Sequence, residues 1–240
     1  MRKVRLLSLA VASLVVLGSP RAATFDDIQF WVGSGANRAG FVVDWNDGKS
    51  AESLLWGFRW DGAATGFDMF EAIIAADAGL FAHVGTFDFG SGPTAGVFGI
   101  GYDLNGDGAF GVSANPPLLF GPGGLTIDPV TAGDDNVDPA GTPVDPADHW
   151  MESWFPAPGF WGYYVKSDAA GVWDSALTGA SERLLTDGSW DGYSFAPDFL
   201  SGAAPGEPIA VVPEPSVLTL GIVGTGLLLL CGCFRRIRAS

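Results

Sequence analysis

One stretch of the chain has the residue types and the spacing of a cation-binding loop. Side chains with carboxylate or amide oxygens stand at alternate positions, Asp103, Asn105 and Asp107, and Gly108 follows them. Alternate oxygens converge when a glycine lets the chain turn sharply, and this is the first half of a calcium loop. Position 12 of such a loop would be Ala114 rather than a glutamate. Two interpretations therefore stay open: a calcium site completed by a carboxylate from elsewhere, or a hairpin turn rich in Asp and Asn without a metal.

Histidine and cysteine offer little for other chemistry. His83 and His149 are the only histidines, and the sequence has no Gly-x-Ser-x-Gly and no His-Glu-x-x-His motif. Both cysteines, Cys231 and Cys233, lie in an apolar run near the C-terminus, so the rest of the chain has no disulfide and no cysteine nucleophile. We expect both histidines to be structural and the protein not to be an enzyme.

Aromatic and acidic residues leave two alternatives to that expectation. Seven aromatic side chains are crowded into the 15 residues from Trp150 to Tyr164. Flat aromatic faces can stack on sugar rings, although aromatic clusters more often form core, and we expect core here. A sugar hydrolase needs only two carboxylates brought together by the fold. Its first candidates are the acids that neighbour aromatic runs, Asp103, Asp107 and Glu152.

Charge is distributed very unevenly along the chain. The span 24–212 contains 5 basic and 26 acidic residues, a net charge of −21. A field of that sign repels nucleic acid and anionic lipid and attracts cations. We therefore expect no binding to DNA or RNA, and a surface that keeps an exported domain soluble.

The elements that must position these residues are mostly strands. Short runs rich in β-branched and aromatic residues, separated by glycine-rich turns, predict a mainly β fold, a β-sandwich or an α+β domain. One interval differs, because apolar residues recur at helical spacing between Thr65 and Gly79, which predicts a short helix near 66–78. The interval 113–149 is rich in Pro, Gly and Asp and predicts a long surface loop.

The N-terminal residues 1–23 have the three-part layout of a secretory signal. Three basic residues come first, an apolar run from Leu6 to Leu17 follows, and Gly18 to Pro20 break it before Ala22 and Ala23. The apolar run of 12 residues is too short to span a bilayer comfortably. We expect cleavage near Ala22 or Ala23, an exported β-rich domain over 24–200, and a linker over 201–212.

The C-terminal residues 213–240 contain a second targeting segment. The run 217–234 carries no charge, and as a helix it would cover about 27 Å, close to the hydrocarbon core of a bilayer. Arg235, Arg236 and Arg238 follow it, and basic residues stay on the cytoplasmic side of a membrane. We expect a transmembrane helix with the acidic domain outside and the arginines inside.

Pro213, Glu214 and Pro215 stand directly before that helix. The order Pro-Glu-Pro, a transmembrane helix and an arginine cluster at the C-terminus resembles the PEP-CTERM sorting signal. The resemblance implies recognition by an exosortase, removal of the tail near the motif, and release to the outer surface or exopolysaccharide matrix of a Gram-negative, biofilm-forming bacterium. A plain single-pass anchor with a proline-rich linker is the alternative.

Three runs of the exported part, FWVGSGANRAGFVVDWNDG, LLWGFRWDG and DGSWDGYSF, resemble an uncharacterised domain of bacterial exported proteins. That resemblance implies a surface domain and no particular activity. The function we expect is therefore a non-enzymatic surface or matrix protein that is processed by an exosortase and placed close to exopolysaccharide. The alternatives are a secreted carbohydrate-active enzyme and a module that binds carbohydrate or another small ligand.

Overall fold

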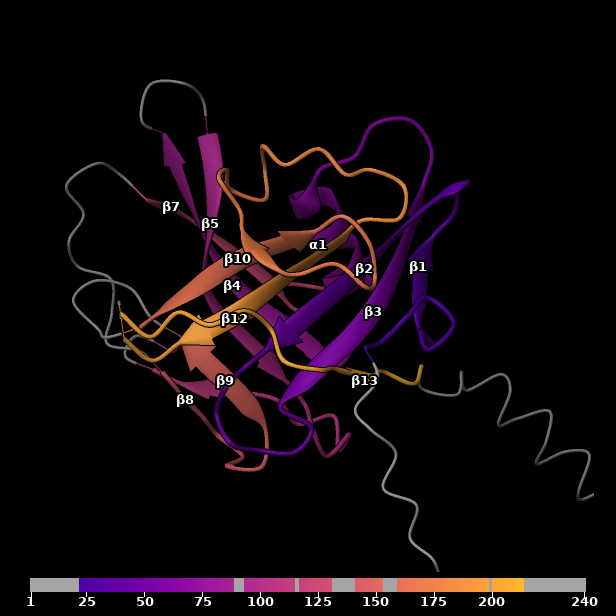
Figure 1. The fold of residues 1–240 in the computed structure, drawn as a ribbon. Helices are drawn as coiled ribbons and strands as arrows, with labels where there is room; N and C mark the ends of the chain where they lie inside the picture. Colours follow the sequence, from indigo (N-terminus) through magenta and orange to yellow (C-terminus); the bar gives the residue numbers. More distant parts are fainter. Residues whose placement is uncertain are drawn as a thin grey trace, which may run out of the picture.

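The computed structural model describes residues 22–88, 93–114, 117–130, 141–152, 159–198 and 200–213. Over these residues the fold is mainly β with one helix, as predicted (Figure 1). The expected signal segment, apart from Ala22 and Ala23, and the expected transmembrane helix over 217–234 lie outside the described residues. Within those residues, no helix is long and apolar enough to cross a membrane.

The larger sheet has seven strands. They run in the order β1-β3-β2-β12-β10-β11, and β13 pairs with β3 on the same edge as β1. The strands are β1 (Trp31–Gly33), β2 (Asn37–Asp44), β3 (Ser53–Trp60), β10 (Phe160–Lys166), β11 (Asp174–Ser175), β12 (Trp190–Ala196) and β13 (Ile209–Ala210). β2 and β3 form an antiparallel hairpin, whereas β12 pairs with β2 in parallel.

The smaller sheet has four strands in the order β7-β4-β5-β9. They are β4 (Leu80–Asp88), β5 (Pro93–Tyr102), β7 (Leu125–Val130) and β9 (His149–Glu152), and the short strands β6 (Val112–Ser113) and β8 (Thr142–Pro143) pair with each other. The interval 113–149, expected to be a surface loop, thus contributes β7, which pairs with β4 in parallel. The many prolines and glycines of this interval favoured a loop, although the run Leu125–Val130 forms a strand.

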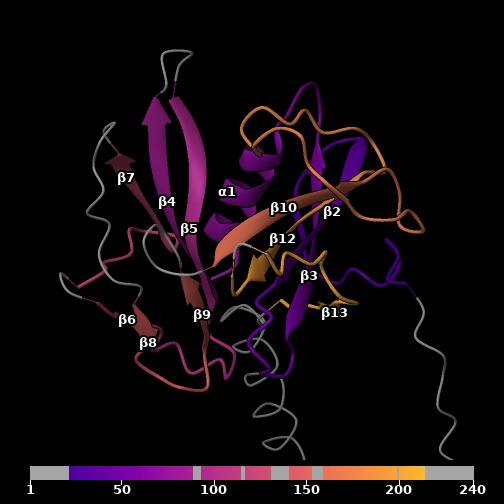
Figure 2. The ribbon, with the colours of Figure 1, turned by 60° about the vertical axis from the view of Figure 1, so that its left-hand side comes forward.

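Helix α1 (Gly66–Ala76) lies between the two sheets (Figure 2). Its start matches the prediction, because Thr65 forms a capping box: its hydroxyl accepts from Asp68 N at 3.1 Å, and the Asp68 carboxylate accepts from Thr65 N at 2.7 Å. Met69 and Phe70 are fully buried, so the helix fills the space between the sheets with apolar side chains.

Several glycines lie within strands rather than in turns, because aromatic rings pack flat against them. A Cβ atom at Gly40 would stand 2.5 Å from the ring of Trp190, and one at Gly99 would stand 2.6 Å from Trp150. Both positions therefore need glycine for close approach of a ring to the backbone. Part of the high glycine content reflects packing of tryptophan onto the sheets.

Tryptophans of the larger sheet also donate hydrogen bonds across the core. Trp45, just after β2, donates to the Ile100 carbonyl in β5 at 2.9 Å. Trp56 in β3 donates to Oδ2 of Asp77, the C-cap of α1, at 2.7 Å, and Trp161 in β10 donates to Met151 O in β9 at 3.1 Å. These bonds connect the larger sheet to both other parts of the domain.

The last part of the chain packs against the same sheet. Gly206 N donates to Asp44 Oδ2 at 2.6 Å, and the buried Val211 donates to the Leu55 carbonyl at 3.1 Å. The interval 201–212, expected to be a linker, is therefore held on the domain over its second half. The signal for β13 was weak because it has only two residues, Ile209 and Ala210.

The cross-core bonds give a test of what holds the domain together. Replacing Trp56 with Phe removes the donor to Asp77, whereas replacing Trp190 with Phe removes an equally buried indole whose Nε1 has no partner in the described structure. We expect Trp56→Phe to lower the free energy of unfolding by about 1–3 kcal/mol more than Trp190→Phe does. Denaturant unfolding of both variants measures this difference, and equal losses would show that the bond contributes little.

Candidate functional site

The loop that follows β5 contains the three residues singled out from the sequence. Gly106 and Gly108 have φ values of 67° and 74°, which allow the chain to turn sharply there. Both oxygens of the buried Asp103 accept backbone hydrogen bonds, from Gly106 N at 2.8 Å and from Gly108 N at 2.7 Å. Asn105 and Asp107 each accept from the backbone N two residues later, at 3.0 and 2.8 Å. The side chains thus fold the loop around Asp103.

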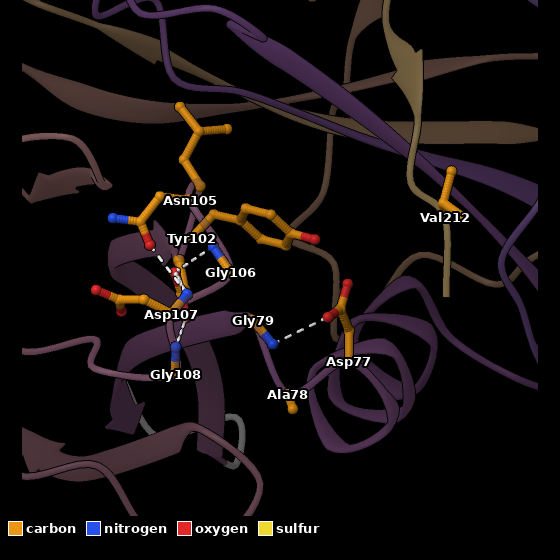
Figure 3. A pocket seen from close by; sticks show the side chains of 11 residues that line it. Asp77, Ala78, Gly79, Tyr102, Asn105, Gly106, Asp107, Gly108 and Val212 are labelled. Carbon is orange, nitrogen blue, oxygen red and sulfur yellow. Dashed lines mark hydrogen bonds between the residues drawn. The ribbon is translucent and has the colours of Figure 1, made fainter. Parts of the chain in front are cut away.

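A pocket of about 470 Å³ lies beside this loop (Figure 3). One wall is the loop itself, and the other is formed by residues just after α1, including Asp77, together with Val212 near the end of the described chain. The Asp77 carboxylate is already engaged, because it accepts from Gly79 N at 3.0 Å and from Trp56. The polar side chains that line the pocket are therefore largely engaged in hydrogen bonds to the protein's own backbone.

A second acidic loop, which precedes β9, lies against the first. Asn105 Nδ2 donates to Asp145 Oδ2 at 2.9 Å, and Leu104 N donates to Asp148 Oδ1 at 3.2 Å. Asp148 is fully buried, and its Oδ2 has no hydrogen-bond partner in the described structure. Burial raises the pKa of the Asp148 carboxyl, and the negative charges of Asp103 and Asp145 raise it further. Sequence reasoning did not connect these two loops.

Asp103, Asn105 and Asp107 are thus brought together in one turn, and Asp145 and Asp148 join them from the second loop. Across the parts of the chain that the structure describes, no three His, Cys, Asp or Glu side chains already surround one point as metal ligands. The side chains of Asp103, Asn105 and Asp107 fold their own loop through hydrogen bonds to its backbone. This geometry is compatible both with a calcium site and with a turn that binds no metal.

His83 lies between two carboxylates on the smaller sheet. Its Nδ1 is 2.7 Å from Glu152 Oε1 on β9, and its Nε2 is 2.8 Å from Asp128 Oδ2 on β7. Burial lowers the pKa of His83, but hydrogen bonds to the two carboxylates outweigh it, so the pKa is raised. Glu152 Oε2 also accepts from Gly141 N at 2.9 Å. The cluster ties β4, β7 and β9 together.

His149 is fully buried and stacks on Trp45, with ring centroids 4.5 Å apart. Its Nδ1 lies 2.9 Å from Asp47 Oδ2 and its Nε2 lies 2.8 Å from the Ala51 carbonyl. Both partners are acceptors, so the ring has no nitrogen left to activate a hydroxyl group. Burial raises the pKa of Asp47, but the hydrogen bonds from His149 and from Lys49 N, together with the positive charge of Lys49, outweigh burial, and the net pKa is lowered. His149 thus joins β9 to the β2–β3 hairpin.

Asp191 is a buried acid that the sequence did not single out. It accepts from the Tyr163 hydroxyl and lies 3.5 Å from Arg183 Nε, and burial raises the pKa of its carboxyl. It comes from β12, on the side of the sheet that faces the start of α1, where a Cβ at Gly66 would stand 3.2 Å from its Oδ2. Tyr163, Asp191 and Arg183 thus connect β10, β12 and the segment before β12.

Five of the crowded aromatic residues lie in the part of the chain that the structure describes, and three of them, Phe160, Tyr163 and Tyr164, are half-buried. Trp150 and Trp161 are buried, and Trp150 lies against Phe110 and Phe120 with ring centroids 6.1 and 5.7 Å apart. Tyr163 lies against Tyr193 at 5.0 Å. Trp150 and Trp161 therefore contribute to the core, as expected.

Comparison of the chain with protein-family models, with curated proteins and with solved structures gave no match.

The His83 cluster predicts a pH dependence of stability. Since the folded state raises the pKa of His83 above 6.5, the cluster contributes fully below that pH and loses its contribution as the pH rises through the raised value. We expect wild-type protein to lose stability above about pH 6.5, and His83→Gln, which does not titrate, to lose less. Thermal unfolding from pH 6 to 9 measures this. Parallel curves for the two proteins would contradict it.

Proposed function

We propose that this chain is a non-enzymatic protein of the outer surface or the exopolysaccharide matrix of a Gram-negative bacterium. In this proposal the N-terminal segment directs export, and the apolar run 217–234 with its arginines holds the precursor in the inner membrane. An exosortase then recognises Pro213, Glu214 and Pro215 and removes the tail behind them. The net negative charge and the lack of cysteine in the span 24–212 suit a soluble domain outside the cell.

The observation that carries this proposal is that both ends of the described chain lie at one edge of the larger sheet. β1 and β13 both pair with β3, and the backbone N of Ala23 lies 3.2 Å from Glu207 Oε2 (Figure 1). Chain ends that lie close together suit a precursor with an apolar segment at each end, because both segments can then reach the same face of a membrane.

The sorting motif also begins close to the folded domain. Val211 makes the last hydrogen bond to β3, and Pro213 follows two residues later. An extended chain covers about 3.5 Å per residue, so the motif starts within about 7 Å of that bond. Two prolines disfavour helix and keep the segment extended, which is the form that a protease binds. Cleavage behind the motif would leave both sheets intact.

The positions of the candidate acids favour this proposal over a sugar hydrolase. Asp103 uses both of its carboxylate oxygens to accept backbone hydrogen bonds. Glu152 is engaged by His83 and by Gly141 N on the smaller sheet. Each of these acids therefore has a structural task, and the two tasks lie in different contact networks.

Processing of the tail is the direct test of this proposal. We expect surface material to contain a mature protein that ends near residue 215, and replacement of Pro213 and Pro215 by Ala to leave the tail attached because the segment is no longer held extended. Peptide mapping of the C-terminus by mass spectrometry measures this. Pro197→Ala, at an exposed proline outside the tail, serves as the control. Recovery of intact residues 217–240 from the wild-type surface protein would contradict the proposal.

The N-terminus gives an independent prediction. Cleavage between Ala22 and Ala23 would turn the amide that faces Glu207 into an ammonium group, which pairs better with a carboxylate. We therefore expect N-terminal sequencing of the exported protein to begin at Ala23. A first residue at Thr24 or beyond would remove this pairing and would contradict the prediction.

A further inference from the structure

The two acidic loops are neighbours because of the pairing of β5 with β9. Tyr102, the last residue of β5, pairs with His149, the first residue of β9. Residues that follow Tyr102 and residues that precede His149 therefore leave the smaller sheet side by side. Asp103 and Asp148 are the first residues on each side, so the sheet itself brings two buried carboxylates together at this edge.

Asp148 is the residue in this group that lacks a partner. One of its oxygens accepts from Leu104 N, but Oδ2 accepts from no group in the described structure. The carboxylate is fully buried, and the charges that influence it most come from Asp103, Asp145 and Asp107, all of the same sign. A buried carboxylate among like charges is costly unless a cation or a proton compensates it.

The nearest basic side chain does not supply that compensation. Lys49 Nζ contacts the backbone carbonyl of Asp148 rather than its carboxylate. The same ammonium lies 3.5 Å from Oδ2 of Asp47, which also pairs with His149. The charge of Lys49 is thus directed to Asp47, and the recorded contact of the Asp148 carboxylate is with Leu104 N of the first acidic loop.

We propose that a calcium ion binds between the two loops, with Asp148 Oδ2 as a ligand beside the loop of Asp103, Asn105 and Asp107. The donor set consists of carboxylate and amide oxygens, which calcium prefers, and calcium accepts six to eight ligands in flexible geometry. Because no three acids yet surround one point, the exposed Asp107 and the half-buried Asp145 must turn toward Asp148 when the ion binds. The carboxylate missing at position 12 of the loop then comes from Asp148, 45 residues away from Asp103 in the chain.

The test follows thermal unfolding of the purified full-length protein during titration with calcium chloride, magnesium chloride and EDTA. Extracellular calcium modules bind at about 0.1–1 mM, so millimolar calcium should raise the melting temperature by a few degrees, and magnesium should raise it less. Asp148→Asn should lose this response without a lower melting temperature in EDTA, because it removes an uncompensated buried charge and keeps the side-chain oxygen that faces Leu104 N.

Asp168→Asn is the matched control, because Asp168 is an exposed acid that accepts from the backbone of Ala170 in a turn far from both loops in sequence. It should keep the full calcium response. If Asp148→Asn does not fold, Asp107→Asn, at an exposed position, should reduce the response in its place. An unchanged wild-type melting temperature in calcium, an equal response to magnesium, or a full response in Asp148→Asn would each overturn the proposal.

Discussion

Hydrogen bonds from three tryptophan side chains hold the layers of this domain in one arrangement. Trp45, Trp56 and Trp161 all belong to the larger sheet or its connections, and each donates across the core to the smaller sheet or to the end of α1. The acceptor residues Ile100 and Asp77 are buried and Met151 is half-buried, so these acceptors would lose their partners if the sheets slid past each other. The span 24–212 has no cysteine and so no disulfide to fix its layers. These directed hydrogen bonds therefore specify one arrangement of the two sheets, which apolar packing alone does not do.

The larger sheet, once fixed in this way, determines where the chain ends lie. β3 has one side paired with β2, and its other side accepts β1 near one end and β13 near the other. The first and last described segments therefore meet, as the contact between Ala23 and Glu207 illustrates. The smaller sheet uses the same principle, since the pairing of β5 with β9 places two acidic loops next to each other. Pairing between strands that are distant in sequence thus brings together the two chain ends and the two acidic loops.

Local patterns in the sequence were sufficient for the features that local interactions determine. The capping box of Thr65 and the apolar spacing behind it specify α1, and apolar runs between turn signals specify strands such as β2 and β3. Pairing across long separations has no local signal, so the parallel contact of β12 with β2 and the contact of Asp148 with the loop at Asp103 could not be predicted. Glycine is also an unreliable signal for a turn, because Gly40 lies within a strand and leaves room for the ring of the distant Trp190.

The attachment of the last described segment of the chain to β3 extends to Val211, two residues before Pro213. Amide hydrogen exchange at Val211 measures it most directly, because that N–H donates to the Leu55 carbonyl at 3.1 Å. We expect slow exchange at Val211, comparable with β3, and fast exchange at the exposed Gly202. Exchange at Val211 as fast as at Gly202 would contradict it, since the segment before Pro213 would then be a free linker.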